Sequence, residues 1–225
     1  HAKGQWMHLL SHDDWIEPEF YQKLLAGKAD ESESHLRFCR TIIYDEGTKQ
    51  SRLMFDEAPE AGILKSFIER QSACQRIQLV GAVFSRKAVE DLGGFDGTLG
   101  PGADWEYWAR IGSRFPVYYH PGQLATYTIH QTSWSNREGN FENAEAFRKF
   151  RNILCKILKH LPPDKKRAAA LGFMSNMLQR LISVACRNKR NGQLEQNRPV
   201  VEALMSASHD AGIQADLEMI LASVQ

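Results

Sequence analysis

Residues 5–18 read Gln-Trp-Met-His-Leu-Leu-Ser-His-Asp-Asp-Trp-Ile-Glu-Pro, an apolar run that ends in two adjacent carboxylates. The run at 5–10 is typical of a short buried strand. Pro18 suits the first turn of a helix over 18–26, which Gly27 would end. Hard cations such as Mg²⁺ and Mn²⁺ often bind one or two carboxylates together with substrate phosphates. The stretch therefore predicts either a metal site facing a diphosphate or, more plainly, aspartates that cap a helix.

Outward from this stretch, strand-like and helix-like segments alternate along the chain. The turn residues at 45–47 separate two strand candidates that would pair as a hairpin. The predicted strands cover 35–44, 51–55, 77–85, 117–119 and 125–129, and the predicted helices cover 60–70, 86–92 and a segment that starts at 104. This alternation predicts an α/β layer fold.

The pattern changes after about residue 141. Apolar residues recur there at spacings of three and four, and Pro162-Pro163 interrupts them before the pattern resumes at Leu171. The spacing predicts an antiparallel helix pair followed by two shorter helices over 199–209 and 213–224. We therefore divide the chain into an α/β part at 1–140 and an all-α tail at 141–225.

Charge is unevenly distributed, although the formal net charge of the 225 residues is only +1. Residues 1–140 carry a net −4, residues 141–192 carry +9 and residues 193–225 carry −4. A solvated helical face explains the basic segment most simply, and contact with an anionic membrane surface or a partner chain is the second reading. No basic strand interleaved with aromatic residues is present, so we expect no nucleic-acid partner.

The four cysteines are spaced too widely for a zinc site or a dense disulfide framework, so we read them as free thiols in a reducing compartment. No signal peptide and no apolar run of about 18–20 residues is visible. Together these features predict a cytoplasmic protein, peripheral to the inner face of a membrane if the basic segment binds lipid.

Three ordered blocks resemble family 2 glycosyltransferases of the GT-A fold. The first is 2–18, in which Ser11-His12-Asp13 occupies the place of the DXD motif and Asp14 follows it. The second joins Gly81–Arg86, Gly93-Gly94-Phe95-Asp96 and the acidic helix start Asp104-Trp105-Glu106. The third is 124–135, Leu-Ala-Thr-Tyr-Thr-Ile-His-Gln-Thr-Ser-Trp-Ser. The blocks cover about residues 2–135 and leave the helical tail outside the resemblance.

The resemblance implies a partial GT-A, Rossmann-like mixed sheet and a metal-dependent, mostly inverting sugar transfer from a nucleotide-sugar to a glycan, glycolipid or protein-glycan hydroxyl. Asp13 and His130 would bind Mg²⁺ or Mn²⁺. Asp104 would be the catalytic base that takes the acceptor proton. Taken by themselves, Asp104 reads as a helix cap and His130 as a structural histidine.

The resemblance also implies a set of residues for donor or acceptor binding: Ser11, Asp14, Arg86, Gly102, Trp105 and Glu106. Arg86 would meet a phosphate, Gly102 would let the backbone approach a ligand, and Trp105 with Trp108 would form a platform for a sugar ring. The plainer readings are a helix start for Arg86, a surface loop for Gly102, a solvated acid for Glu106, and core packing for one of the two tryptophans.

The sequence departs from the family pattern in ways that keep other functions open. Ser11 replaces the first aspartate of DXD, Thr128 replaces a common arginine, and the nucleotide-binding strands of the family would lie upstream of residue 1. A truncated or degenerate glycosyltransferase-like module that binds or scaffolds without catalysis is therefore the alternative. A nucleotidyltransferase is a weaker third possibility.

Overall fold

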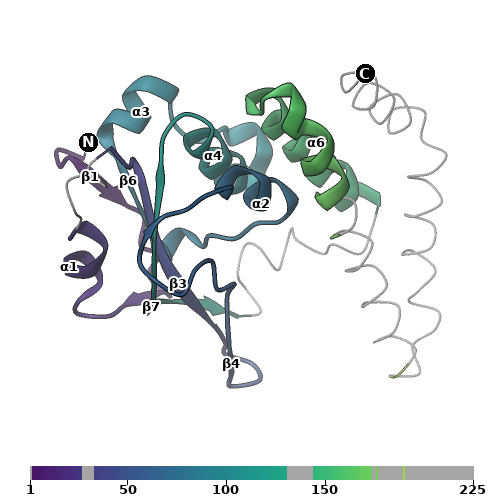
Figure 1. The fold of residues 1–225 in the computed structure, drawn as a ribbon. Helices are drawn as coiled ribbons and strands as arrows, with labels where there is room; N and C mark the ends of the chain where they lie inside the picture. The colour runs from purple at the N-terminus through teal and green to yellow at the C-terminus, as the bar shows by residue number, and fades with distance from the viewer. Residues whose placement is uncertain (1, 27–32, 131–143, 174–175, 177–189, 191–225) are drawn as a thin grey trace.

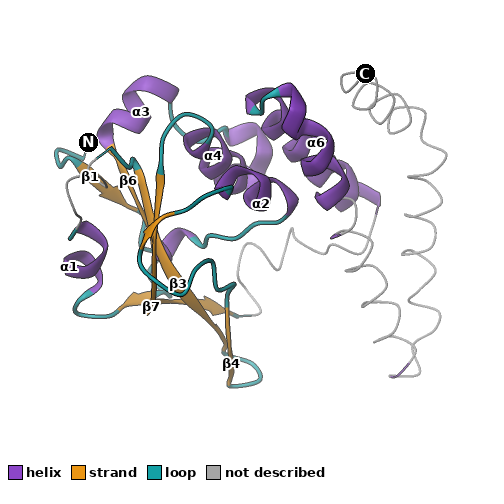
Figure 2. Cartoon of the chain, in the orientation of Figure 1, coloured by secondary structure: helices purple, strands orange, loops and turns teal. Residues whose placement is uncertain are grey.

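The computed structural model describes residues 2–26, 33–130 and 144–173, together with 176 and 190. These residues form a mixed α/β fold, as the alternation of segments predicted (Figure 2). The predicted helices beyond residue 176 lie outside the described residues.

One mixed sheet organises the fold, with strand order β1-β6-β3-β7-β2. Its strands are β1 (Trp6–His8), β2 (Trp15–Ile16), β3 (Leu36–Asp45), β6 (Ala82–Ser85) and β7 (Val117–Ile129), with β4 (Gln50–Leu53) paired to β3 and β5 (Gly62–Ile63) paired to β7. The central β3 and β7 run parallel, from Leu36 beside Val117 to Asp45 beside Ile129. The other pairs are antiparallel, including the β3–β4 hairpin predicted from the turn at 45–47.

β7 is one strand of thirteen residues, whereas the sequence predicted two short strands around Pro121-Gly122. The Gly122 N–H donates to the Nδ1 atom of His120, and the pairing register with β3 shifts near Arg40. The sheet therefore absorbs the Pro-Gly dipeptide as a local irregularity instead of ending there. As a consequence, β7 extends to Ile129, next to His130.

Two other predicted elements are shorter than expected. The predicted helix over 60–70 is wrong at its start, because β5 pairs with β7 and the Leu64 N–H donates to the Val117 carbonyl; helix α2 covers only Phe67–Ala73. In place of a strand over 77–85, the 3₁₀ turn η2 (Leu79–Gly81) precedes β6. At 60–66 tertiary pairing overrides local propensity, whereas at 78–81 a local hydrogen bond from the Gly81 N–H to the Gln78 carbonyl closes the turn.

Helices cover both faces of the sheet (Figure 1). Successive residues of β3 point to opposite faces: Phe38 packs with Trp108 of α4 (Ala103–Gly112), and Cys39 packs with Phe20 of α1 (Phe20–Leu25). Helix α3 (Arg86–Leu92) starts at Ser85, whose hydroxyl accepts the Ala88 N–H as an N-cap.

Helix α6 (Ala144–His160) packs directly on the α/β part, so the described start of the tail shares a core with it. Ile153 lies against Gly102 so closely that a Cβ added at Gly102 would fall 2.0 Å from a methyl group of Ile153. Gly102 ends the 3₁₀ segment η3 (Gly97–Gly102), just before α4. The shared apolar cluster contains Ile68, Leu99, Trp105, Ala109, Ile153, Leu154, Ile157, Leu158, Leu161, Ala169 and Phe173.

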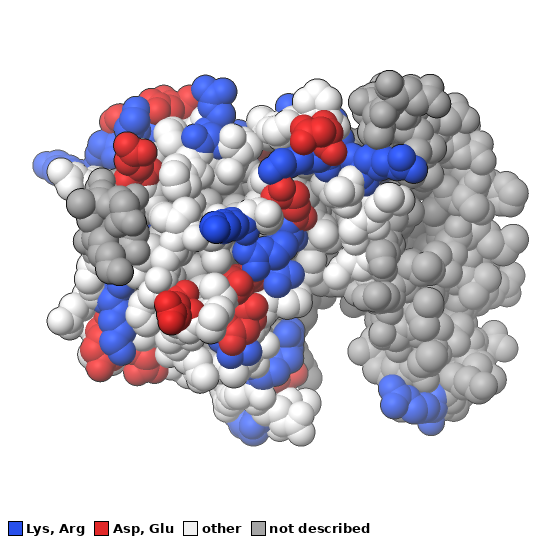
Figure 3. Space-filling model, in the orientation of Figure 1, with Lys and Arg blue, Asp and Glu red and all other residues white. Residues whose placement is uncertain are grey.

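Acidic side chains of the α/β part face basic ones of the tail within the described residues. The pairs are Lys156 with Asp96, His160 with Glu106 at 3.2 Å and Lys165 with Glu69 at 2.6 Å. Figure 3 shows Lys, Arg, Asp and Glu interspersed on the described face. Part of the charge asymmetry read from the sequence is therefore complementary within the chain. Among the described residues, no helix has the length and apolar character needed to cross a membrane.

Candidate functional site

The two adjacent aspartates lie in the turn that joins β1 to β2. The Asp14 N–H donates to the Ser11 carbonyl at 3.3 Å, and the Asp14 carboxylate accepts the Thr128 N–H of β7 at 2.8 Å. β2 then pairs Trp15 with Thr126. The turn is thus held at the edge of the sheet beside the end of β7.

Asp13 and His130 meet across 117 residues of sequence. The Nε2 atom of His130 lies 2.8 Å from Oδ2 of Asp13, and both side chains are about one-quarter exposed. Partial burial acts to raise the pKa of Asp13, but the hydrogen bond to His130 and other local interactions outweigh it, so this pKa lies below its usual value. The structure therefore brings together the two residues that the sequence predicted as metal ligands.

The donor set at this position fits a divalent cation. An ionised carboxylate and an imidazole nitrogen are ligands that Mn²⁺ accepts, and substrate phosphates usually complete such sites. Asp14 lies beside them; burial raises its pKa to about 6, with the Asp13 charge adding to the shift and the Thr128 N–H opposing it. Within the described residues, no group of three or more His, Cys, Asp or Glu side chains gathers as a metal cluster.

An exposed tryptophan, packed edge-on against a half-buried tyrosine, borders the carboxylates. Trp15 follows Asp14 directly and is 46% exposed, and its ring lies 6.0 Å from that of Tyr44 on β3. An indole held open to solvent beside two carboxylates suits the apolar face of a ring-shaped ligand. The sequence reading noted this tryptophan only as a neighbour of the motif.

Asp104 stands in the first turn of α4, as predicted. One carboxylate oxygen accepts the Trp105 N–H at 2.8 Å, and the other accepts the side-chain amide N–H of Gln75 at 2.7 Å. Burial raises the pKa of Asp104 to about 7, and these hydrogen bonds limit the rise. A carboxylate with this pKa can accept a proton near neutral pH.

The segment that follows Gln75, the partner of Asp104, runs back to the sheet. Its 3₁₀ turn, η2, contacts both β2 and β7. Four residue steps separate Gln75 from Leu79, so the two Cα atoms lie at most about 14 Å apart. One short segment therefore joins Gln75 to β2, which begins two residues after Asp13, and to β7, which ends one residue before His130.

No family model matches the chain, and no curated protein matches it. The glycosyltransferase resemblance thus stands on the three sequence blocks alone.

Several residues that were predicted to bind the donor or acceptor instead pack against, or hydrogen-bond to, other residues of the protein. Trp105 is 6% exposed, packs on Phe173 of the tail and donates its indole N–H to the Gln71 carbonyl; Trp108 is fully buried. Both tryptophans are core residues here. Arg86 donates to the carbonyls of Gly4 and Ala2.

Glu106 and Gly102 face the tail. The Glu106 carboxylate is buried and accepts two N–H groups of Arg110, both at 2.9 Å, besides its contact with His160. The space next to the Gly102 Cα, where a side chain would lie, is occupied by the Ile153 side chain. Of the predicted binding residues, Ser11 is exposed and Asp14 lies beside Asp13.

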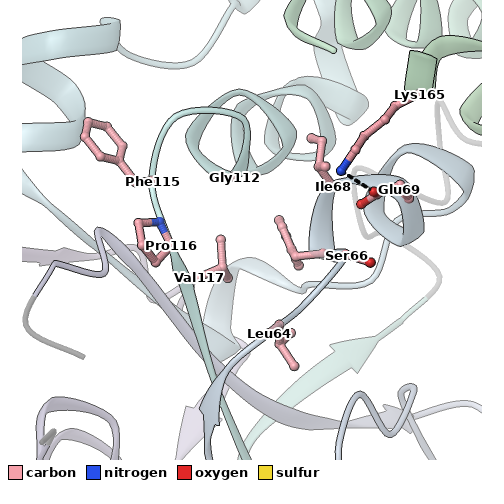
Figure 4. Close-up of a pocket in the computed structure, with 10 residues that line it drawn as sticks. Leu64, Ser66, Ile68, Glu69, Gly112, Phe115, Pro116, Val117 and Lys165 are labelled. Atoms are coloured by element: carbon pink, nitrogen blue, oxygen red, sulfur yellow. Dashed lines mark ion pairs between the residues drawn. The ribbon is translucent and has the colours of Figure 1, made fainter. Parts of the chain in front are cut away.

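A cavity of about 150 Å³ lies elsewhere, between α2, the end of α4 and the start of β7 (Figure 4). It is lined by Leu64, Ser66, Phe67, Ile68, Glu69, Gly112, Phe115, Pro116, Val117 and Lys165, a set that includes none of the predicted site residues. The ion pair between Lys165 and Glu69 closes one side of it.

Proposed function

We propose that this protein is a metal-dependent, inverting glycosyltransferase of the GT-A type. It moves a sugar from a nucleotide-sugar donor to a hydroxyl group of a glycan, glycolipid or protein-glycan acceptor. One observation carries the proposal: Asp13 and His130, named as metal ligands from two separate sequence blocks, lie 2.8 Å apart.

Asp104 is the proposed catalytic base. Its carboxylate accepts the proton of the acceptor hydroxyl while the acceptor oxygen bonds to the anomeric carbon and the bond from that carbon to the diphosphate oxygen breaks. The nucleoside diphosphate leaves with the bonding electrons, so a single displacement inverts the anomeric centre. A pKa raised to about 7 by burial makes Asp104 a stronger base than an ordinary aspartate.

Asp13 and His130 would hold Mg²⁺ or Mn²⁺, which would neutralise the charge that develops on the departing diphosphate. Asp14 supports this arrangement because its hydrogen bond from the Thr128 N–H ties the turn to β7. The exposed indole of Trp15 offers a surface for a sugar or base ring at the same edge.

The basic segment 141–192 is proposed to keep the enzyme in the cytoplasm at an anionic inner membrane surface, or against a partner chain. Its net charge of +9 supports this placement. Some of its basic side chains are engaged by acids of the α/β part, so the remaining charge would determine the strength of such contact.

A module that binds nucleotide-sugars or glycans without catalysis is the second candidate. Its support is that Ser11 stands where the family pattern has the first aspartate of the DXD motif, so the site has one carboxylate fewer to hold a metal for catalysis.

Donor binding and donor turnover by the full-length protein test the two candidates. Calorimetry would measure binding of UDP, GDP and dTDP with and without Mn²⁺, and a coupled assay would measure diphosphate release from the matching nucleotide-sugars. We expect Asp13→Asn to weaken Mn²⁺-dependent binding more than tenfold. Asp104→Asn should preserve binding and slow release about 100-fold.

Two other experimental results would contradict the proposed function. Mn²⁺-dependent binding with no release by the wild type would establish the binding module instead. Nucleotide binding that ignores both Mn²⁺ and Asp13→Asn would refute the metal site.

A further inference from the structure

We propose that Gln75 is a positioning residue for Asp104 and that Gln71 sets the direction of the Gln75 amide. This assignment rests on the proposed function, in which Asp104 is the base. The Gln71 side-chain N–H donates to the Gln75 side-chain oxygen at 2.9 Å, and the Gln75 N–H donates to Asp104 at 2.7 Å. The three side chains thus form a directed chain of hydrogen bonds.

The direction of this chain follows from backbone groups at its start. Gln71 is fully buried; its amide oxygen accepts the Arg76 N–H at 3.2 Å, and its amide nitrogen donates to the Trp105 carbonyl at 3.3 Å. Reversing the Gln71 amide would place two donors together at Arg76 and two acceptors together at Trp105. Gln71 therefore presents an N–H to Gln75, and Gln75 must in turn present its own N–H to Asp104.

The same residues clamp α2 to α4. Besides the bond to the Trp105 carbonyl, the Gln71 carbonyl accepts the indole N–H of Trp105. Two bonds of opposite direction thus join Gln71 to the residue that follows Asp104. Because one oxygen of Asp104 also accepts the Trp105 N–H, the carboxylate is held on one side by its own helix and on the other by Gln75.

A neutral amide is a suitable partner for a base. An arginine or lysine at this position would lower the pKa of the carboxylate by about 1–3 units and weaken it as a proton acceptor. The charged groups of the adjoining elements are engaged elsewhere: Arg76 pairs with Glu57, and Arg110 and His160 pair with Glu106. Gln75 therefore orients the carboxylate without adding charge to it.

Replacing Gln75 by Met removes the donor and keeps the length of the side chain. The matched control is Gln78→Met, on the same segment. Titration of the Asp104 carboxyl carbon by ¹³C NMR, assigned with Asp104→Asn, reads the effect without any substrate. Loss of a donor to the ionised form should raise the titration midpoint of Asp104 by about one unit in Gln75→Met and leave it in place in Gln78→Met. Equal midpoints in the two variants would overturn the assignment.

Kinetics test whether this positioning serves turnover. In Gln75→Met, diphosphate release should slow at least tenfold in kcat at neutral pH, the acidic limb of the pH–rate profile should move upward, and KM for the donor should stay unchanged. A moved midpoint with unchanged kcat would overturn the catalytic part of the inference. If the wild type releases no diphosphate, the proposed function fails, while the NMR midpoint still decides whether Gln75 orients Asp104.

Discussion

Replacing Asp104 by Asn should change how the stability of the protein depends on pH. The folded-state pKa of Asp104 is about 7, against an ordinary value of 3.8 for an aspartate, because burial disfavours the charged carboxylate. The folded state therefore holds this proton across a window in which the unfolded chain releases it. The resulting stabilisation is complete below about pH 4 and is lost as pH rises through about 7.

The magnitude follows from the size of the shift. Each pKa unit corresponds to about 1.4 kcal/mol, so the shift has an upper limit of about 4 kcal/mol. Because the side chain is only partly enclosed, water screens the charge, and we expect a change of about 2 kcal/mol. Asn keeps an acceptor for the Trp105 N–H but turns an N–H toward the amide of Gln75, which adds an offset that does not vary with pH.

Urea unfolding at several pH values between about 4.5 and 8, followed by fluorescence of the buried Trp105 and Trp108, measures the effect. The free energy of unfolding of the wild type minus that of Asp104→Asn should fall by about 2 kcal/mol from the lowest to the highest pH. Gln78→Met is the control because it changes no ionisable group. The free energy of unfolding of the wild type minus that of Gln78→Met should not vary with pH. A wild-type–Asn difference that is flat across this range would refute the reasoning.

Three further outcomes are expected. Gly102→Ala should destabilise the protein by about 1–3 kcal/mol in urea unfolding, because its Cβ collides with Ile153, and adding Ile153→Ala should recover part of the loss; purely additive effects would contradict the close contact. Asp13→Asn should weaken Mn²⁺ binding more than tenfold by calorimetry while Glu19→Gln, the same loss of charge at an exposed position outside the site, changes it less than twofold; equal effects would remove Asp13 from the site. Leu24→Ala should cost about 2–5 kcal/mol of unfolding free energy because Leu24 is fully buried between α1 and the sheet, and a cost below 1 kcal/mol would show that α1 does not cover that face.

The local sequence pattern was sufficient to predict many of the strands, helices and turns of the fold. The hairpin after residue 44, the helix over 86–92 with Ser85 before it, and the break at Pro162 all depend on residues close together in sequence. The prediction failed over 60–70, where the Leu64 N–H pairs with the Val117 carbonyl, because such pairing depends on a strand more than fifty residues away.

The candidate site was predicted only in part. Asp13, Asp14 and Asp104 stand out because carboxylates directly follow a strand or open a helix. Gln71 and Gln75 carry no such signal, since glutamines are common in polar helices, and their role depends on meeting Trp105 and Asp104 about thirty residues further on. Glu106 was predicted to bind an acceptor or, equally, to be a solvated first-turn acid, but in the structure it is buried and contacts His160 of α6.

Local sequence was enough to place most of the strands and helices and the carboxylates along them, because backbone propensity and apolar period act over a few residues. Only the tertiary structure decided that His130 reaches Asp13. That contact requires β7 to continue through Pro121-Gly122 in parallel register with β3, and this continuation depends on hydrogen bonds and burial that no local window contains.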